Sequence, residues 1–275
     1  MRANSFHHLL KLLSNDDCWN VFVKHAFENK KANEHPNLEL IQQRIVEKCS
    51  GLPLAGKLLG GLLRSEPQDR WERVLSRKIW NKSGVFPVLR LSYQHLPSHL
   101  KRCFAYCALF SKDYGFKQKE LILLWMAGDL IHQAEEDNCQ MEEDLGVDYF
   151  NELLSRCFFQ PSSDSKSKFI MHDLINDLTQ EVATKICFNF ENIHKVSQRT
   201  RHLSFVRGEY DVFRKFEVLN KPEQLRTFVA LPITLDTKKK CYLSNKVLHG
   251  LLPKLGQLRV LSLSGYEINE LRVNW

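Results

Sequence analysis

Residues 169–183, FIMHDLINDLTQEVA, contain a regular apolar repeat that determines how the middle of the chain folds. Its apolar residues recur at helical spacing and are Met171, Leu174, Ile175, Leu178 and Val182. His172 and Asp173 lie off that stripe, in the first helical turn. They are therefore available to cap the helix, to bind a ligand at its N-terminus, or to remain solvated.

The segments before this helix predict a winged-helix module. We expect two helices in 86–110, separated by Pro97 and with Ser98 as a cap, one amphipathic helix in 117–131 and another in 135–159. Two short apolar stretches around a polar tip, FQPSSDSKSKFIM (159–171), predict a β-hairpin. Helices followed by a hairpin and a terminal helix are typical of winged-helix folds.

The N-terminal third predicts a group of short helices. Residues 13–27, LSNDDCWNVFVKHAF, begin with a capping signature at Ser14 or Asn15. A second helix carries Leu38, Ile41, Ile45, Val46 and Cys49 and ends at Gly51, which can adopt the left-handed conformation. Pro53 begins a third helix, PLAGKLLGGLLR, and a short fourth helix is expected in 69–80.

The C-terminal third predicts the start of a repeat array. RHLSFV (201–206) and LRTFVAL (225–231) alternate as strands do, and LRTFVAL lies 33 residues before LRVLSLS. The leucine spacing in 252–271 matches the core of a leucine-rich repeat. We expect the lysine run 238–240 and the segment CYLSNKVLHG (241–250) to form a solvated loop.

Charge is distributed unevenly along the chain. Residues 1–109 carry a net charge of +8, residues 110–183 carry −9 and residues 184–275 carry +8. Because DNA binding requires Lys and Arg to neutralise phosphates, the acidic middle argues against a DNA-binding winged helix. The basic flanks are more consistent with docking surfaces for acidic parts of the same protein.

Composition excludes several other classes of function. No window is long and apolar enough to span a membrane, and the N-terminus lacks a signal-peptide cleavage site. The eight cysteines are scattered, and only Cys103 and Cys107 have metal-ligand spacing, without a second pair. Buried free thiols in a reducing compartment are therefore expected. No catalytic motif is found, so we expect no enzymatic activity.

These motifs, in this order, closely resemble those of one protein family. LSNDDCW, CSGLPLAGKLLGGLLR, LRLSYQHLPSHLKRCFAYCALFSKDY, LILLWMAGDLI, FIMHDLINDL and RTRHLSF resemble motifs of plant intracellular disease-resistance receptors of the coiled-coil, NB-ARC and leucine-rich-repeat type. The resemblance covers nearly the whole chain. It implies a mainly α fold: a helical subdomain and a winged-helix subdomain of a STAND-type nucleotide switch, followed by the start of an α/β leucine-rich repeat.

The resemblance also implies boundaries. Residues 1–30 correspond to the tail of the nucleotide-binding subdomain and 31–83 to the helical subdomain with the GLPL motif. Residues 84–190 correspond to the winged-helix subdomain with the MHD motif, and 191–275 to a linker and the first, incomplete repeats. In this family ADP holds a cytoplasmic receptor closed, and ATP opens it for oligomerisation and defence signalling.

Specific residues inherit expected roles from this resemblance. Pro53, with Leu54 beside it, would contact the adenine of ADP or ATP, and His172 the β-phosphate. Asp173 would orient His172, because a carboxylate in direct contact with phosphate is repelled. Three of these residues also have a purely structural explanation. Pro53 is suited to a first helical position, His172 to a capping or solvated position at a helix start, and Asp173 to the positive end of a helix dipole.

Several family features are absent from this sequence. No G-x-x-x-x-G-K-[ST] occurs, and neither does the magnesium-binding aspartate pair, so we expect weak or no nucleotide binding by this chain alone and no ATP hydrolysis. We expect the chain to be a fragment, a truncated gene product or a partial gene model. Its expected partners are other domains of the same receptor or a full-length receptor. The alternative is a nucleotide-free interaction or decoy module that associates with full-length receptors.

Overall fold

The computed structural model describes residues 11–27, 38–77, 80, 85–131, 139–165, 167–183, 186–189, 196–220, 223–232 and 240–268. The chain divides into two compact units. Unit 1 comprises Met1–Leu96 and Ser155–Phe158, and unit 2 comprises Pro97–Leu154 and Phe159–Trp275.

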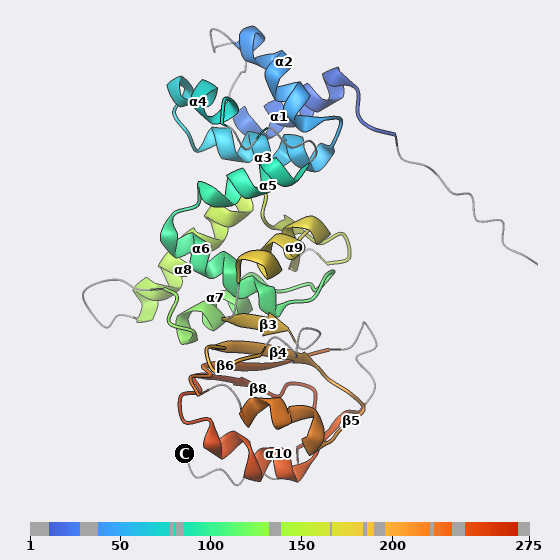
Figure 1. Cartoon of the computed structure of the whole chain (residues 1–275), viewed down its shortest axis with the longest axis vertical. Helices are drawn as coiled ribbons and strands as arrows, with labels where there is room; N and C mark the ends of the chain where they lie inside the picture. Colours follow the sequence, from blue (N-terminus) through green and yellow to red (C-terminus); the bar gives the residue numbers. More distant parts are fainter. Residues whose placement is uncertain are drawn as a thin grey trace, which may run out of the picture. The chain divides into compact units, whose positions relative to one another are not determined.

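Unit 1 is built from helices. Figure 1 draws them as α1 (Asn15–Phe27), α2 (Leu38–Cys49), α3 (Pro53–Arg64), α4 (Trp71–Leu75) and α5 (Val85–Gln94), and the 3₁₀ turn η2 (Gln68–Arg70) precedes α4. Ser14 caps α1 as predicted, since its Oγ accepts a hydrogen bond from the Asp17 amide at 3.1 Å. All five apolar residues predicted for the second helix are buried, which confirms its period.

Helix α3 lies at the centre of unit 1. Its buried face packs against α1 on one side and against α5 on another. Helix α5 falls in the range that the resemblance assigns to the winged-helix subdomain, yet here it completes the core of unit 1. The aromatic rings of Phe22, Phe27 and Trp71 pack together over the same core.

The first part of unit 2 has the predicted helix and hairpin order. Helices α6 (Ser98–Tyr106), α7 (Gln118–Ala127) and α8 (Cys139–Ser155) precede the antiparallel strands β1 (Gln160–Pro161) and β2 (Phe169–Ile170), and α9 (Asp173–Val182) follows. The 3₁₀ turn η4 (Cys107–Leu109) ends α6. Phe116 pairs with Phe169 and so adds a third segment to the hairpin. The expected Ser98 cap is wrong: Pro97 occupies the cap position, and Ser98 is the first helical residue.

The second part of unit 2 is a parallel sheet with the order β3-β4-β6-β8. The strands are β3 (Cys187–Asn189), β4 (His202–Val206), β6 (Thr227–Leu231) and β8 (Val260–Ser262), and they lie one above the next in Figure 1. Thr227 pairs with Val260, which reproduces the 33-residue offset in the sequence. The sheet also includes β3 and β4, although the leucine spacing alone did not predict that these strands belong to the same sheet.

A hydrophobic core fills the space between this sheet and the return segments. It joins strand residues such as Phe205 and Phe228 to η6 (Phe213–Asn220), α10 (Asn245–Gly250) and η7 (Leu252–Lys254). A second, two-stranded parallel sheet joins β5 (Tyr210–Asp211) to β7 (Tyr242–Leu243). The expected solvated loop at 241–250 is therefore wrong from Cys241 onward, because Leu243, Val247 and Leu248 are core residues. Lys238 and Lys239 lie outside the described residues.

Two further expectations concern the whole chain. Within the described ranges, no helix has both the length and the apolar character needed to cross a membrane. The seven cysteines whose side chains the structure describes, which exclude Cys139, are free thiols, and all except Cys157 are buried, as predicted.

Candidate functional site

The N-terminus of α9 is capped by His172 itself. The His172 backbone is extended, with φ −63° and ψ 145°, and its Nδ1 accepts a hydrogen bond from the Leu174 amide at 3.2 Å. Because Nδ1 acts as the acceptor, the neutral ring carries its proton on Nε2. The side chain is exposed, so this arrangement directs an N–H donor outward at the positive end of a helix.

Helix α9 is fixed to the segment that follows α6 by polar side chains. Asn176 donates to the Phe110 carbonyl at 3.0 Å, and Gln180 donates to the Ala108 carbonyl at 2.7 Å. Asn176 and Thr179 are buried although the apolar stripe excluded them. No local pattern predicts these contacts, because only the packed structure brings the Phe110 carbonyl to the helix.

Asp173 is exposed in the first turn of α9, where its negative charge interacts favourably with the helix dipole. One turn later, Asp177 lies 2.7 Å from Lys112 Nζ. That hydrogen bond raises the pKa of Lys112, and the charge of Asp173 adds to the effect. The ring orientation of His172 follows from the Leu174 amide, so an orienting role of Asp173 would act through its charge.

The GLPL turn in unit 1 presents Pro53 at the surface. Ser50 and Gly51 both adopt positive φ, at 51° and 73°, so that the chain reverses between α2 and α3. A Cβ on Gly51 would lie 2.7 Å from Leu12 Cβ, and its carbonyl accepts from the Leu13 amide at 2.9 Å. Pro53 is the first helical residue, as predicted, and is exposed, whereas Leu54 is half-buried.

Residues 51–57, GLPLAGK, match the spacing of a phosphate-binding loop up to its lysine, but the next residue is Leu58. The structure excludes such a loop here. The Ala55 and Gly56 amides donate to the Leu52 carbonyl at 3.1 and 3.3 Å, so they belong to the first turn of α3. Leu58 is fully buried. Backbone amides committed to a helix cannot cradle a phosphate.

A cavity of about 630 Å³ lies beside the GLPL turn, between the start of α1 and the end of α2. Its lining includes Leu13, Asp16, Gln43, Glu47 and Gly51, but neither Pro53 nor Leu54. Pro53 and Leu54 belong to unit 1, and His172 and Asp173 belong to unit 2.

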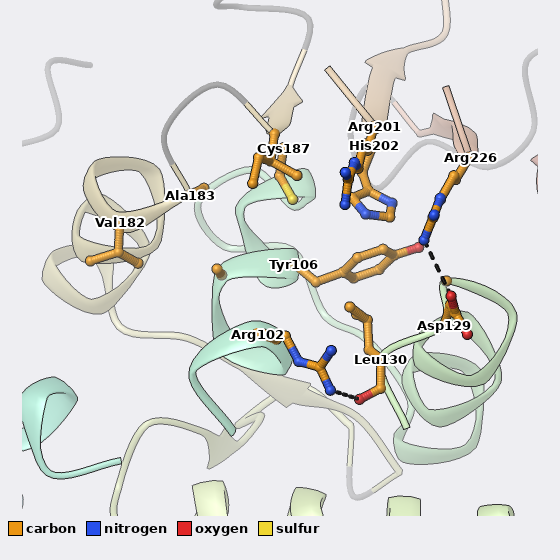
Figure 2. Close-up of a pocket in the computed structure, with 13 residues that line it drawn as sticks. Arg102, Tyr106, Asp129, Leu130, Val182, Ala183, Cys187, Arg201, His202 and Arg226 are labelled. Atoms are coloured by element: carbon orange, nitrogen blue, oxygen red, sulfur yellow. Dashed lines mark hydrogen bonds and ion pairs between the residues drawn. The ribbon is translucent and has the colours of Figure 1, made fainter. Parts of the chain in front are cut away.

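Unit 2 contains a second cavity, of about 240 Å³, that the sequence did not predict (Figure 2). Its walls come from α6, from the segment after α7, from the end of α9 and from the beginnings of β3, β4 and β6. Tyr106 lies in the middle of the close-up, with Leu130 below it and Arg226 beside it. Its hydroxyl lies 3.3 Å from Thr227 Oγ1, which in turn lies 3.0 Å from His202 Nδ1.

The histidine in this cavity is held neutral. His202 is almost fully buried, and its ring packs edge-on against Tyr106 with 4.9 Å between centroids. Burial lowers the pKa of His202 from 6.5 to about 4, and the positive charges of Arg226 and Arg201 contribute to the shift. None of the described residues forms a cluster of three or more His, Cys, Asp or Glu side chains suited to a metal ion.

Comparison with known proteins identifies the module that contains His172. Residues 109–179 match the family described as the winged-helix domain of disease resistance proteins. This part of unit 2 is therefore a disease-resistance-type winged-helix domain, as its helix and hairpin order predicted.

Nearly the whole chain is homologous to plant disease resistance proteins of the NB-ARC class. It is 45% identical to the RPP13-like protein 1 of Arabidopsis thaliana, over 96% of this chain and 25% of that protein. It is 39% identical to disease resistance protein RGA2 of Solanum bulbocastanum, over 82% of this chain and 24% of that protein. Disease resistance protein RPM1 of Arabidopsis thaliana is 34% identical, over 64% of this chain and 20% of its own length. The chain thus spans a fifth to a quarter of these relatives.

Proposed function

We propose that this chain acts in plant defence as the sensing part of an ADP/ATP-switched receptor. In that context His172 donates a hydrogen bond from Nε2 to the β-phosphate of ADP, and Pro53 and Leu54 contact the adenine. Asp173 helps to orient the His172 ring. Residues 31–83 and 84–190 would be the helical and winged-helix subdomains of the switch, and residues 191–275 would begin the repeats.

The cap at His172 is the observation that carries this proposal. A histidine whose Nδ1 accepts from Leu174 keeps its proton on Nε2, on an exposed edge at a helix N-terminus. The helix dipole at that position favours an anion. A phosphate group matches this arrangement better than a cation does.

The acidic exposed face of α9 supports the choice of a nucleotide switch over a DNA-binding winged helix. Asp173, Asp177 and Glu181 are exposed along this helix. Three carboxylates along this exposed helix would repel the phosphates of a duplex that docked on it. A steep salt-dependent gel shift with duplex DNA would contradict this interpretation.

The capping and phosphate-binding roles of His172 can be separated by substitution. Residues 1–275 replace the matching segment of the RPP13-like relative, and the purified receptor is assayed for retained ADP. His172→Ser keeps a capping oxygen but cannot reach a phosphate, whereas His172→Ala loses both roles. We expect both variants to lose ADP and only His172→Ala to lose about 1 kcal/mol of helix stability.

Retention of ADP at the wild-type level by His172→Ser would overturn the phosphate role. The isolated chain gives an independent test of the expected weak binding. Isothermal titration with ADP should show no binding tighter than the micromolar range, and a sub-micromolar Kd would contradict that expectation. Capture of an intact receptor by the chain, unchanged in His172→Ala, would instead support the nucleotide-free interaction module.

A further inference from the structure

Three arginines form a ladder across the starts of the repeat strands. His202 pairs with Thr227 and Thr227 with Val260, so the preceding residues Arg201, Arg226 and Arg259 are also in register. The Arg226 amide donates to the Arg201 carbonyl at 2.7 Å, and the Arg259 amide donates to the Arg226 carbonyl at 2.8 Å. Neighbouring strands are about 4.8 Å apart, so three positive side chains begin on adjacent rungs.

One acidic side chain from the winged-helix domain compensates part of this charge. Asp129, held at φ 66° after α7, lies 3.3 Å from Arg226 and 3.0 Å from Arg259. No acidic partner of Arg201 is found in the part of the chain that the structure describes. Like charges on adjacent rungs repel each other, so the ladder favours a second anion on its Arg201 side.

The cavity of Figure 2 opens on that side of the ladder. Arg201 and Arg226 line it, whereas Arg259 does not. The rest of the lining is mostly apolar and includes Tyr106, Leu130 and Ile186, together with the carboxylate of Asp129 that pairs with Arg226. Arg102 adds a further guanidinium, whose Nη2 donates weakly to the Leu130 carbonyl at 3.4 Å.

We propose that this cavity binds a small organic anion. Its carboxylate or phosphate is held by Arg201 and Arg226, and its apolar body lies against Tyr106 and Leu130. At about 240 Å³ the cavity is smaller than the usual range for drug-sized ligands, so it selects a compact molecule with one ring or a short chain.

The buried histidine gives this site an internal reporter. The positive charges of Arg201 and Arg226 help to keep the pKa of His202 low, so an anion bound between them would raise it. The ligand would also contact both the winged-helix helices and the first repeat strands, because the cavity walls come from both. Binding would therefore stabilise the connection between these parts of unit 2.

The test uses the full chain and three probes: phenyl phosphate, benzoate and inorganic phosphate. Saturable binding is followed by isothermal titration and by the imidazole resonances of His202. We expect at least one aromatic anion to bind in the millimolar range or tighter, and more tightly than inorganic phosphate. Phenyl phosphate and benzoate distinguish a phosphate site from a carboxylate site.

Arg201→Gln and Arg226→Gln should each weaken binding by about tenfold or more, since each removes a charge-assisted hydrogen bond. Arg259→Gln is the matched control. Arg259 belongs to the same ladder and pairs with the same Asp129, but it lies outside the cavity, so binding should change by less than about twofold.

Several results would overturn the proposal. They are no saturable binding of either aromatic probe to the wild type at about 10 mM, equal loss of affinity in all three variants, or equal affinity for inorganic and phenyl phosphate. Arg201 is exposed, so Arg201→Gln is expected to fold normally, and far-UV circular dichroism checks this. An unchanged pKa of His202 at saturation would likewise contradict binding between the two arginines.

Discussion

Burial divides the described cysteines into two chemical groups. Burial raises the pKa of Cys49, Cys103 and Cys187 to about 12 each, so these side chains remain protonated thiols at neutral pH. Cys157 differs because it is only half-buried, adopts a positive φ of 64°, and has its Sγ 3.5 Å from His25 Nδ1. A histidine in contact with a thiol promotes formation of the reactive thiolate.

We therefore expect Cys157 to be the fastest-reacting of the seven described cysteines. In a Cys139→Ser background, a maleimide or an aromatic disulfide should modify one thiol of the native protein at least about tenfold faster than the rest. Peptide mapping identifies the labelled residue, and Cys157→Ser should remove the fast phase. His25→Ala should slow it. A fast phase that persists in Cys157→Ser would show that a buried cysteine becomes accessible by local opening.

At the scale of elements, the packing of α1 on α3 depends on small residues. A Cβ on Gly60 would lie 2.8 Å from the Phe22 carbonyl oxygen and 2.9 Å from His25 Cβ. The first of these atoms is backbone and cannot move without displacing α1. The glycine in the middle of α3 is therefore explained by the close approach of a second helix, although glycine weakens an isolated helix.

Gly60→Ala should destabilise the chain by roughly 1 kcal/mol. Alanine gains up to about 1 kcal/mol in helix propensity, but overpacking a tight contact costs about 1–3 kcal/mol. Gly250→Ala provides the contrast, because a Cβ there meets no atom within 4 Å. That variant should be unchanged or slightly more stable. Urea unfolding of the two variants gives the comparison, and equal effects would mean that α1 and α3 separate easily.

Elements with strong local signals could be predicted from the sequence. The Ser14 cap, the left-handed Gly51, the first helical position of Pro53 and the hairpin before α9 all match the structure. These features depend on a few neighbouring residues, so a local pattern is enough. The segment 241–250 was misjudged because its apolar residues are interrupted by polar ones and are buried only by contact with distant strands.

The two candidate sites differ in the same way. His172 could be found because one turn of an amphipathic helix exposes it. The arginine ladder could not, because Arg201, Arg226 and Arg259 are brought together only by the register of three strands. Pairing joins residue 202 to 227 and residue 227 to 260, so the two intervals along the chain differ in length. A search for a sequence repeat with one fixed period therefore finds only one of the two pairs.

At the scale of the whole molecule, unit 2 joins the winged-helix domain to the parallel sheet that follows it through buried polar contacts. Ser204 of β4 donates to the Leu109 carbonyl, and Tyr106 of α6 contacts Thr227 of β6. Asp129 adds ion pairs to Arg226 and Arg259, which precede β6 and β8. Removing one partner of a buried hydrogen bond costs more folding free energy than removing an exposed contact. The buried contacts therefore make the two parts of unit 2 mutually dependent.

His202 gives this connection a defined pH dependence. Its pKa is about 4 in the folded chain and 6.5 without burial, so the unfolded chain binds a proton that the folded chain excludes. The contribution of the neutral histidine to the free energy of unfolding is therefore complete above pH 6.5, and it is lost as the pH falls towards 4. The expected loss approaches roughly 3 kcal/mol. Other groups also titrate in this window, so the measurement is a difference between two proteins.

His202→Gln is the comparison, because glutamine can hydrogen-bond to Thr227 but does not titrate. Free energies of unfolding from urea titrations at several pH values between 7.5 and 4 should fall more steeply for the wild type than for the variant. The two curves should converge towards low pH, where the wild type has lost the contribution of the neutral ring. Parallel curves would mean that His202 takes up its proton in the folded chain at its ordinary pKa, and thus that the Tyr106–Thr227–His202 contact is open to water.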